Sequence, residues 1–192
     1  MVCESELETE CLGGVLASSR TEISRDDRAA SLIALIGRLS TYQLRTHYIM
    51  YALAQRALAG QAVTVGESNV RDRAGAFFLP HDDWVGAMAL SAAEHHEWDS
   101  ISGHIFNGLM REGLMDERFA YGSPETLRDF APWRTFPAQG FVYTISMLGI
   151  ELFTAAHGLT EPALKVFLDP GKCSINEDID LGAGSFKLFD PP

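Results

Sequence analysis

Apolar side chains recur every three or four positions in two successive stretches near the start of the chain. The stretches cover residues 27–39 and 41–59, and their spacing predicts two amphipathic helices. Ser40 and Gln43 match a capping box, in which a hydroxyl and an amide side chain satisfy each other's backbone amides at a helix start. We expect the two helices to pack together as a helical hairpin.

The rest of the chain mixes short strand patterns with further helices. Residues 76–80 form an apolar run closed by a proline, and residues 141–145 are the second clear strand. The helical predictions are a short helix capped by Asp82 or Asp83, a helix after the Ser91–Glu94 capping box that breaks at Gly113, and helices over 124–130, 147–157 and just after Pro162. Residues 114–121 are predicted to be extended. The pattern predicts an α+β fold that is mostly helical, with a small antiparallel sheet.

The two ends of the chain lack this periodicity and are rich in acid. Residues 1–10 contain four glutamates and no basic residue, and residues 169–192 contain five acidic residues and two lysines. We therefore predict a flexible acidic leader over 1–25, a single domain over 26–168 and an acidic tail over 169–192. Solvated tails explain the charge, and an acidic arm that docks on a basic partner is the alternative.

Composition narrows the class of protein. The 192 residues are 46% hydrophobic and 21% charged, which is typical of a folded globular chain. No stretch approaches the roughly 18 apolar residues of a membrane span, and the start lacks the features of a secretory signal. The 3 cysteines have no C-x-x-C spacing, so we expect free thiols in a reducing compartment. These features predict a cytoplasmic protein with no membrane contact.

Two segments carry a resemblance to a known family. The order helix, strand, helix, helix, strand, loop, strand, helix over 41–157 resembles a winged helix. Ser102–Met115 looks like its recognition helix and first wing strand, and Phe141–Phe153 looks like the second wing strand and closing helix. Ser146 stands where the family often has threonine, with Gly149 three residues on. Residues 27–158 are also similar to the abortive-infection alpha-type domain of bacterial defence proteins.

The winged-helix resemblance implies DNA binding through the recognition helix, but the charges oppose it. Between Ser91 and Glu112 the chain has four carboxylates and one arginine, and the whole chain has a net charge of -11, so phosphates would be repelled. We therefore predict a non-enzymatic winged-helix adaptor or regulator that binds another protein or a second copy of itself. The resemblance implies phage defence or counter-defence as its setting. The alternative is a DNA-binding transcriptional regulator with one basic face, formed by Arg71, Arg73, Arg118, Arg128 and Arg134.

The predicted partner-binding residues lie on the recognition-like helix and on the wing. They are Trp98, Asp99, His104 and Phe106 on the helix, and Arg118 and Arg134 on the wing. Nearby aromatic residues belong either to the core or to an exposed interface patch, since aromatics are enriched at both: Trp84, Trp98, Phe130, Trp133 and Phe136.

No catalytic motif is visible. The chain has no glycine-rich phosphate loop and no nucleophile elbow. A metal-dependent hydrolase built on His81, His95, His96 and His104 is a third hypothesis, but these residues lack any established three-ligand spacing. We expect polar surface residues there, and we predict no enzyme, no metal and no cofactor.

Overall fold

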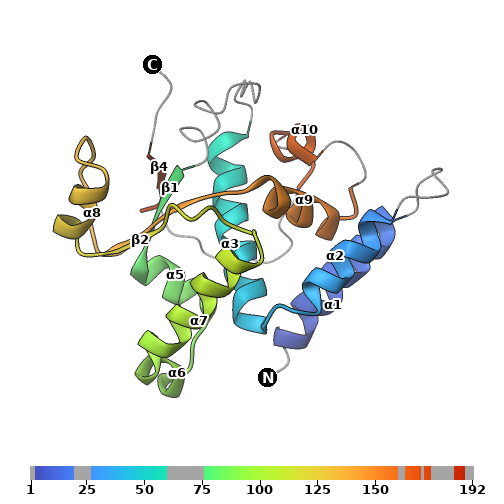
Figure 1. Cartoon of the computed structure of the whole chain (residues 1–192), viewed down its shortest axis with the longest axis horizontal. Coiled ribbons are helices and arrows are strands. Elements are labelled where there is room, and N and C mark those ends of the chain that lie inside the picture. Colours follow the sequence, from blue (N-terminus) through green and yellow to red (C-terminus); the bar gives the residue numbers. More distant parts are fainter. Residues whose placement is uncertain are drawn as a thin grey trace.

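A computed structural model describes residues 3–19, 27–59, 76–159, 163–169, 171–173 and 184–188. The chain is mostly helical with a small antiparallel sheet, which confirms the predicted α+β class (Figure 1). The helices are α1 Cys3–Ser18, α2 Arg28–Ile36, α3 Thr41–Leu58, α5 His81–Met88, α6 Ala92–His96, α7 Trp98–Arg111, α8 Pro124–Phe130, α9 Met147–Ala156 and α10 Ala163–Phe167. The strands are β1 Ala76–Pro80, β2 Ala120–Gly122, β3 Gly140–Thr144 and β4 Phe186–Lys187.

The sheet has the strand order β2-β3-β1-β4, with every neighbouring pair antiparallel. Both central strands, β1 and β3, are buried along their whole length. Alternate residues of β1 face two different apolar clusters: Phe77 lies in the larger cluster and Phe78 in the smaller one beneath α8. Burial on both faces explains why the strand appears in the sequence as a continuous apolar run.

Helix α3 runs through the middle of the molecule, with α1 and α2 on one side and the sheet on the other (Figure 1). The predicted capping box at its start is confirmed: Gln43 N donates to Ser40 Oγ at 3.3 Å, and Ser40 N donates to Gln43 Oε1 at 2.9 Å. Tyr51, farther along the helix, donates its hydroxyl proton to Leu114 O at 2.6 Å and accepts from Ser146 N at 2.9 Å. These bonds tie α3 to both the segment before β2 and the start of α9.

Helix α1 corrects the prediction of a flexible leader over residues 1–25. Leu7, Cys11 and Val15 are buried in the main core, four residues apart, and they form a narrow apolar stripe along the helix. Helix α1 packs against α9 and also against α2. Because α2 packs more closely against α1 than against α3, the predicted hairpin of the second and third helices is also wrong.

The predicted acidic tail over 169–192 is wrong where the structure describes it. Phe186–Lys187 form β4, which pairs with β1 opposite Phe77 and Phe78. Cys173 and Leu188 are buried at 5% and 1% exposure. The paired part of this segment is only two residues long, too short for a strand to be identified from the sequence, so the strand depends on the edge of β1 that receives it.

The remaining predicted elements are confirmed in part. The single helix predicted after the Ser91–Glu94 capping box is divided at Glu97 into α6 and α7. Of the extended segment predicted over 114–121, only residues 120–121 lie in a strand, with one isolated bridge at Met115. Helix α8 starts at Pro124 after a Ser123 cap, and α9 starts after Ser146, whose Oγ accepts from Gly149 N at 3.0 Å. Helix α5 begins at His81, so Asp82 and Asp83 lie in its first turn instead of capping it. Across the described ranges, no helix has the length and apolar character needed to cross a bilayer.

His47 makes the stability of the core sensitive to pH. Burial lowers its pKa from 6.5 to about 4, while its Nε2–H donates to Gly149 O at 3.2 Å. Between these two values the unfolded chain binds a proton that the folded chain does not, so acidification removes stability throughout this window. We expect the urea concentration at the unfolding midpoint to fall when the pH is lowered from about 7 to about 5. The His47→Gln variant should show a smaller fall. Identical pH profiles for the two proteins would contradict the assignment.

Candidate functional site

Helix α7 has one buried face and one polar, exposed face. Ile105, Phe106 and Leu109 are buried, and they fix the helix against α3 and the sheet. The exposed face carries four polar side chains at positions spaced by four, three and four residues: Ser100, His104, Asn107 and Arg111. This surface is the one that the sequence predicted to contact a partner.

Phe106 is not part of that surface. Its ring is 4% exposed, stacks on Phe119 with 4.6 Å between ring centroids, and lies 4.7 Å from Phe141. The prediction that Phe106 contacts a partner is therefore wrong. The sequence held a sign of this, since phenylalanine is buried far more often than asparagine and Phe106 lies three positions before Leu109 on the apolar face of the helix.

Trp98 lies between the core and the surface. Its half-buried indole meets Trp84 edge-on at 4.9 Å and His81 at 4.7 Å. Tyr121 lies 6.0 Å away on β2, so the indole joins the start of α7 to the sheet. Burial lowers the pKa of His81, which favours the neutral imidazole in this aromatic cluster. Only part of Trp98 therefore remains available to a partner.

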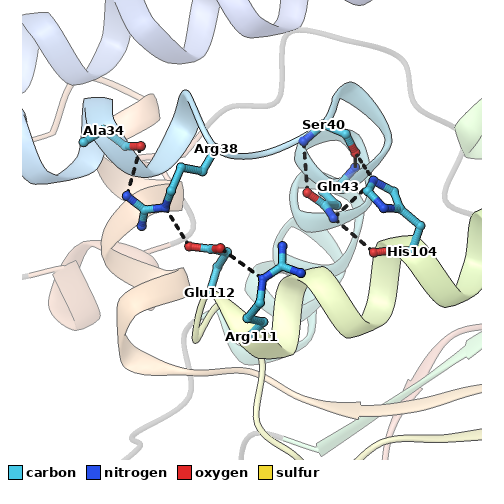
Figure 2. A network of polar contacts seen from close by, with 7 residues as sticks. All are labelled: Ala34, Arg38, Ser40, Gln43, His104, Arg111 and Glu112. Carbon is cyan, nitrogen blue, oxygen red and sulfur yellow. Dashed lines mark hydrogen bonds and ion pairs between the residues drawn. The ribbon is translucent and has the colours of Figure 1, made fainter.

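Asp99 and His104 are both exposed, in agreement with their predicted place on the surface. His104 also contacts the capping box of α3: its Nε2 lies 3.1 Å from Ser40 Oγ and 3.4 Å from Gln43 Nε2 (Figure 2). Gln43 Nε2 donates to the carbonyl oxygen of His104 at 3.0 Å. The imidazole therefore links α7 to the start of α3, besides facing solvent.

A chain of charges continues toward the end of α7. Arg38 Nε donates to Glu112 Oε2 at 2.9 Å, and Arg111 Nε lies 3.4 Å from Glu112 Oε1 (Figure 2). The hydrogen bond from Arg38 is the main cause that lowers the pKa of the Glu112 carboxyl. Two arginines of this edge are thus neutralised in part by one carboxylate.

The other end of this surface is acidic. The Ser91–Glu94 capping box of α6 is present, with Ser91 N donating to Glu94 Oε2 at 2.6 Å, and the Tyr42 hydroxyl also donates to Glu94. Hydrogen bonds from Ser91 and then Tyr42 lower the pKa of Glu94 to about 2, which keeps it ionised. Glu97 and Asp99 are exposed close by in the sequence.

The two predicted wing arginines have different surroundings. Arg118 is exposed in the segment before β2. Arg134 is half-buried: its Nε donates to Leu188 O, its Nη2 donates to Lys187 O at 3.3 Å, and its guanidinium lies 5.9 Å from the Phe186 ring centroid. These contacts join the segment after α8 to the segment that contains β4, so part of the Arg134 side chain is engaged inside the molecule. The predicted contact of Arg134 with a partner stays a prediction.

Five aromatic residues were predicted to lie either in the core or in an exposed interface patch, and the structure buries some of them and exposes others. Trp84 and Phe136 are fully buried, and Trp98 is half-buried. Trp133 is 58% exposed and Phe130 is 39% exposed, and both lie at the end of α8, which Figure 1 shows at the far side of the molecule from α1. We call Phe130 and Trp133 the wing patch. The helix-breaking Pro132 between them was the one local sign that this stretch leaves the packed elements.

The described residues supply little support for a single basic face or a metal centre. Arg128 is exposed, and its Nη2 lies 3.9 Å from Glu125 Oε1. Arg71 and Arg73 lie outside the described residues. Within the described ranges, no group of three or more histidine, cysteine or acidic side chains is placed to hold a metal ion. The metal-dependent hydrolase hypothesis therefore gains no ligand set from this part of the chain.

Comparison of the chain with protein-family models, curated proteins and solved structures gives no match. The resemblances to the winged helix and to the abortive-infection domain therefore stay predictions.

Proposed function

We propose that this chain is a non-enzymatic regulator or adaptor that binds another protein through a winged-helix-like unit. Two features support the unit: α7 leads into β2 and β3 leads into α9, and the wing strands β2 and β3 join the first strand in the order β2-β3-β1. These are the connections that the sequence resemblance implies. Helix α8 is inserted between the two wing strands and carries the wing patch at its end.

The observation that carries the proposal is the exposure of the wing patch. Trp133 is 58% exposed and Phe130, three residues earlier in the sequence, is 39% exposed, so both leave apolar area in water that burial against a partner would remove. Tryptophan is also among the residues that contribute most to protein interfaces when it enters a pocket of the partner. The net charge of -11 favours a partner with a basic surface around such a pocket.

A comparison of two exposed apolar residues tests this. We expect Trp133→Ala to weaken binding of a basic partner at least about tenfold, because interface tryptophans commonly contribute that much. Leu16→Ala is the matched control, since Leu16 is 55% exposed but lies on α1. A photo-crosslinking residue at the exposed position 129 keeps Trp133 in place and identifies the partner, and titration calorimetry with the purified partner then gives the affinity of each variant.

Three outcomes would contradict the proposal in different ways. Equal affinities for the Trp133→Ala and Leu16→Ala variants would remove the wing patch from the interface. Crosslinking only between copies of this chain, with a dimer seen by sedimentation equilibrium, would make the partner a second copy. Catalytic turnover of a small substrate by the purified protein would overturn the non-enzymatic reading.

DNA binding is the second candidate, and the exposed face of α7 is the observation that favours it. Asn107 and Arg111 are exposed and have the side chains that read adenine and guanine edges in the major groove. The carboxylates at the start of the helix and the net charge of -11 oppose it.

We expect no binding of a random-sequence duplex in fluorescence anisotropy, even at low salt, because the acidic surface repels phosphates. DNA binding that weakens steeply as the salt concentration is raised, and that is lost in Arg111→Gln, would make DNA-binding transcriptional regulation the leading function. Arg56→Gln on α3 is the matched control, because Arg56 is exposed and lies outside the arginines predicted to contact DNA.

A further inference from the structure

A cleft of about 480 Å³ opens between α1 and the end of α9. One face of α1 forms its first wall, Tyr48 of α3 forms the back, and residues 156–158 with Lys172 complete it. Its volume lies within the range of sites that bind small molecules. The cleft is distant in the sequence from α7 and the wing, and the inference below is independent of the proposed function.

The cleft borders the contact between α1 and α9, where the two helices approach closely at Gly14 and leave open space at Gly13. At Gly14 a Cβ would lie 1.8 Å from Ala156 O, so only glycine allows this contact. At neighbouring Gly13 a Cβ would meet nothing within 4 Å, so the adjacent turn of α1 borders open space. Both glycines line the cleft.

The inner wall of the cleft is aromatic. The rings of Tyr48 and His157 are stacked, with an interplanar angle of 14° and 6.3 Å between centroids, and Phe153 supports His157 at 4.5 Å. The Nδ1–H of His157 donates to Phe153 O at 2.7 Å. In the neutral ring this bond leaves Nε2 as an acceptor, and no described residue donates to it.

The rim carries opposite charges. Glu10 of α1 and Lys172 are both exposed, and both line the cleft. A carboxylate accepts from a ligand ammonium group, and an ammonium group donates to a ligand carboxylate. Together with the aromatic wall, the two rim charges match a molecule that has a flat apolar body and carries both an ammonium group and a carboxylate.

We propose that this cleft binds a zwitterionic aromatic molecule of the α-amino-acid class. The ring of the ligand packs against Tyr48 and His157, its ammonium group donates to Glu10 and to His157 Nε2, and its carboxylate accepts from Lys172. Each charge of the ligand thus has an opposite charge on the rim, and burial of the ring supplies the apolar part of the affinity.

Three soluble probes separate the parts of this site. L-tryptophan has the ring and both charges, tryptamine lacks the carboxylate, and indole-3-propionate lacks the ammonium group. We expect L-tryptophan to shift the NMR amide signals of residues 13 and 158, and to bind about tenfold more tightly than either analogue, since a charge-assisted hydrogen bond contributes about that factor.

Two pairs of variants locate the binding. Gly13→Leu places a side chain in the open space of the cleft and should abolish binding, while Gly86→Leu, at a second exposed helical glycine with nothing within 4 Å, should not. Lys172→Gln should weaken the binding of L-tryptophan about tenfold and leave the binding of tryptamine unchanged. Lys165→Gln on α10 is the control. The proposal is overturned if L-tryptophan shifts no signal at the cleft, if the two analogues bind as tightly as it does, or if Gly13→Leu binds like the parent.

Discussion

Replacing Phe106 by alanine is expected to lower the free energy of unfolding by about 3–5 kcal/mol, the usual cost of removing a buried phenylalanine ring. The ring is 4% exposed and packs against Phe119 and Phe141, at 4.6 Å and 4.7 Å between centroids. Its loss leaves a cavity between α7 and β3. Urea unfolding followed by circular dichroism at 222 nm (the helix band) measures the effect.

Two variants keep this prediction interpretable. Asn107→Ala changes the exposed neighbour on the same helix and should alter the stability by less than about 0.5 kcal/mol. Phe106→Leu keeps most of the apolar volume, so it should lie between the alanine variant and the parent if Phe106→Ala fails to fold. A stability for Phe106→Ala equal to that of Asn107→Ala would show that the ring is not packed in the core.

Replacing Gly149 by alanine is expected to cost about 3 kcal/mol or more, because the new methyl group overpacks a fixed part of the core. An added Cβ would lie 1.8 Å from Tyr51 Oη and 2.8 Å from the backbone oxygen of Leu114. The Tyr51 hydroxyl cannot move away cheaply, since it bonds to Leu114 O at 2.6 Å and to Ser146 N at 2.9 Å. Thermal unfolding of the variant measures the loss.

Gly86→Ala is the matched control for this experiment. Gly86 lies in α5 with nothing within 4 Å of an added Cβ, so alanine should leave the stability unchanged or raise it by up to about 1 kcal/mol through its helix propensity. Equal melting temperatures for Gly149→Ala and the parent would contradict the contact between Gly149 and Tyr51. The expected contrast also gives a physical reason for the Ser146–Gly149 spacing: the serine caps α9, and the glycine admits the tyrosine.

The candidate site could be predicted from the sequence only in part. Asp99, His104 and Arg118 are exposed as expected, because a polar side chain on an amphipathic helix or in a loop faces solvent in most folds. Phe106 and Arg134 are engaged inside the molecule, by Phe141 of β3 and by the backbone of the segment that contains β4. Both partners come from distant parts of the chain, which no local pattern reveals. For the same reason, the sequence did not decide whether the residues of the wing patch lie in the core or on the surface.

The sequence by itself determined the local elements. Periodicity located α3, α7, α9 and the two central strands, and the two capping boxes located the starts of α3 and α6, because these signals depend only on residues within a few positions of each other. Only the tertiary structure decided that α1 folds onto α9, that β4 joins the sheet, and which aromatic rings are buried. The stripe of Leu7, Cys11 and Val15 is too sparse to predict a stable helix alone, so its order depends on the surface that α9 provides.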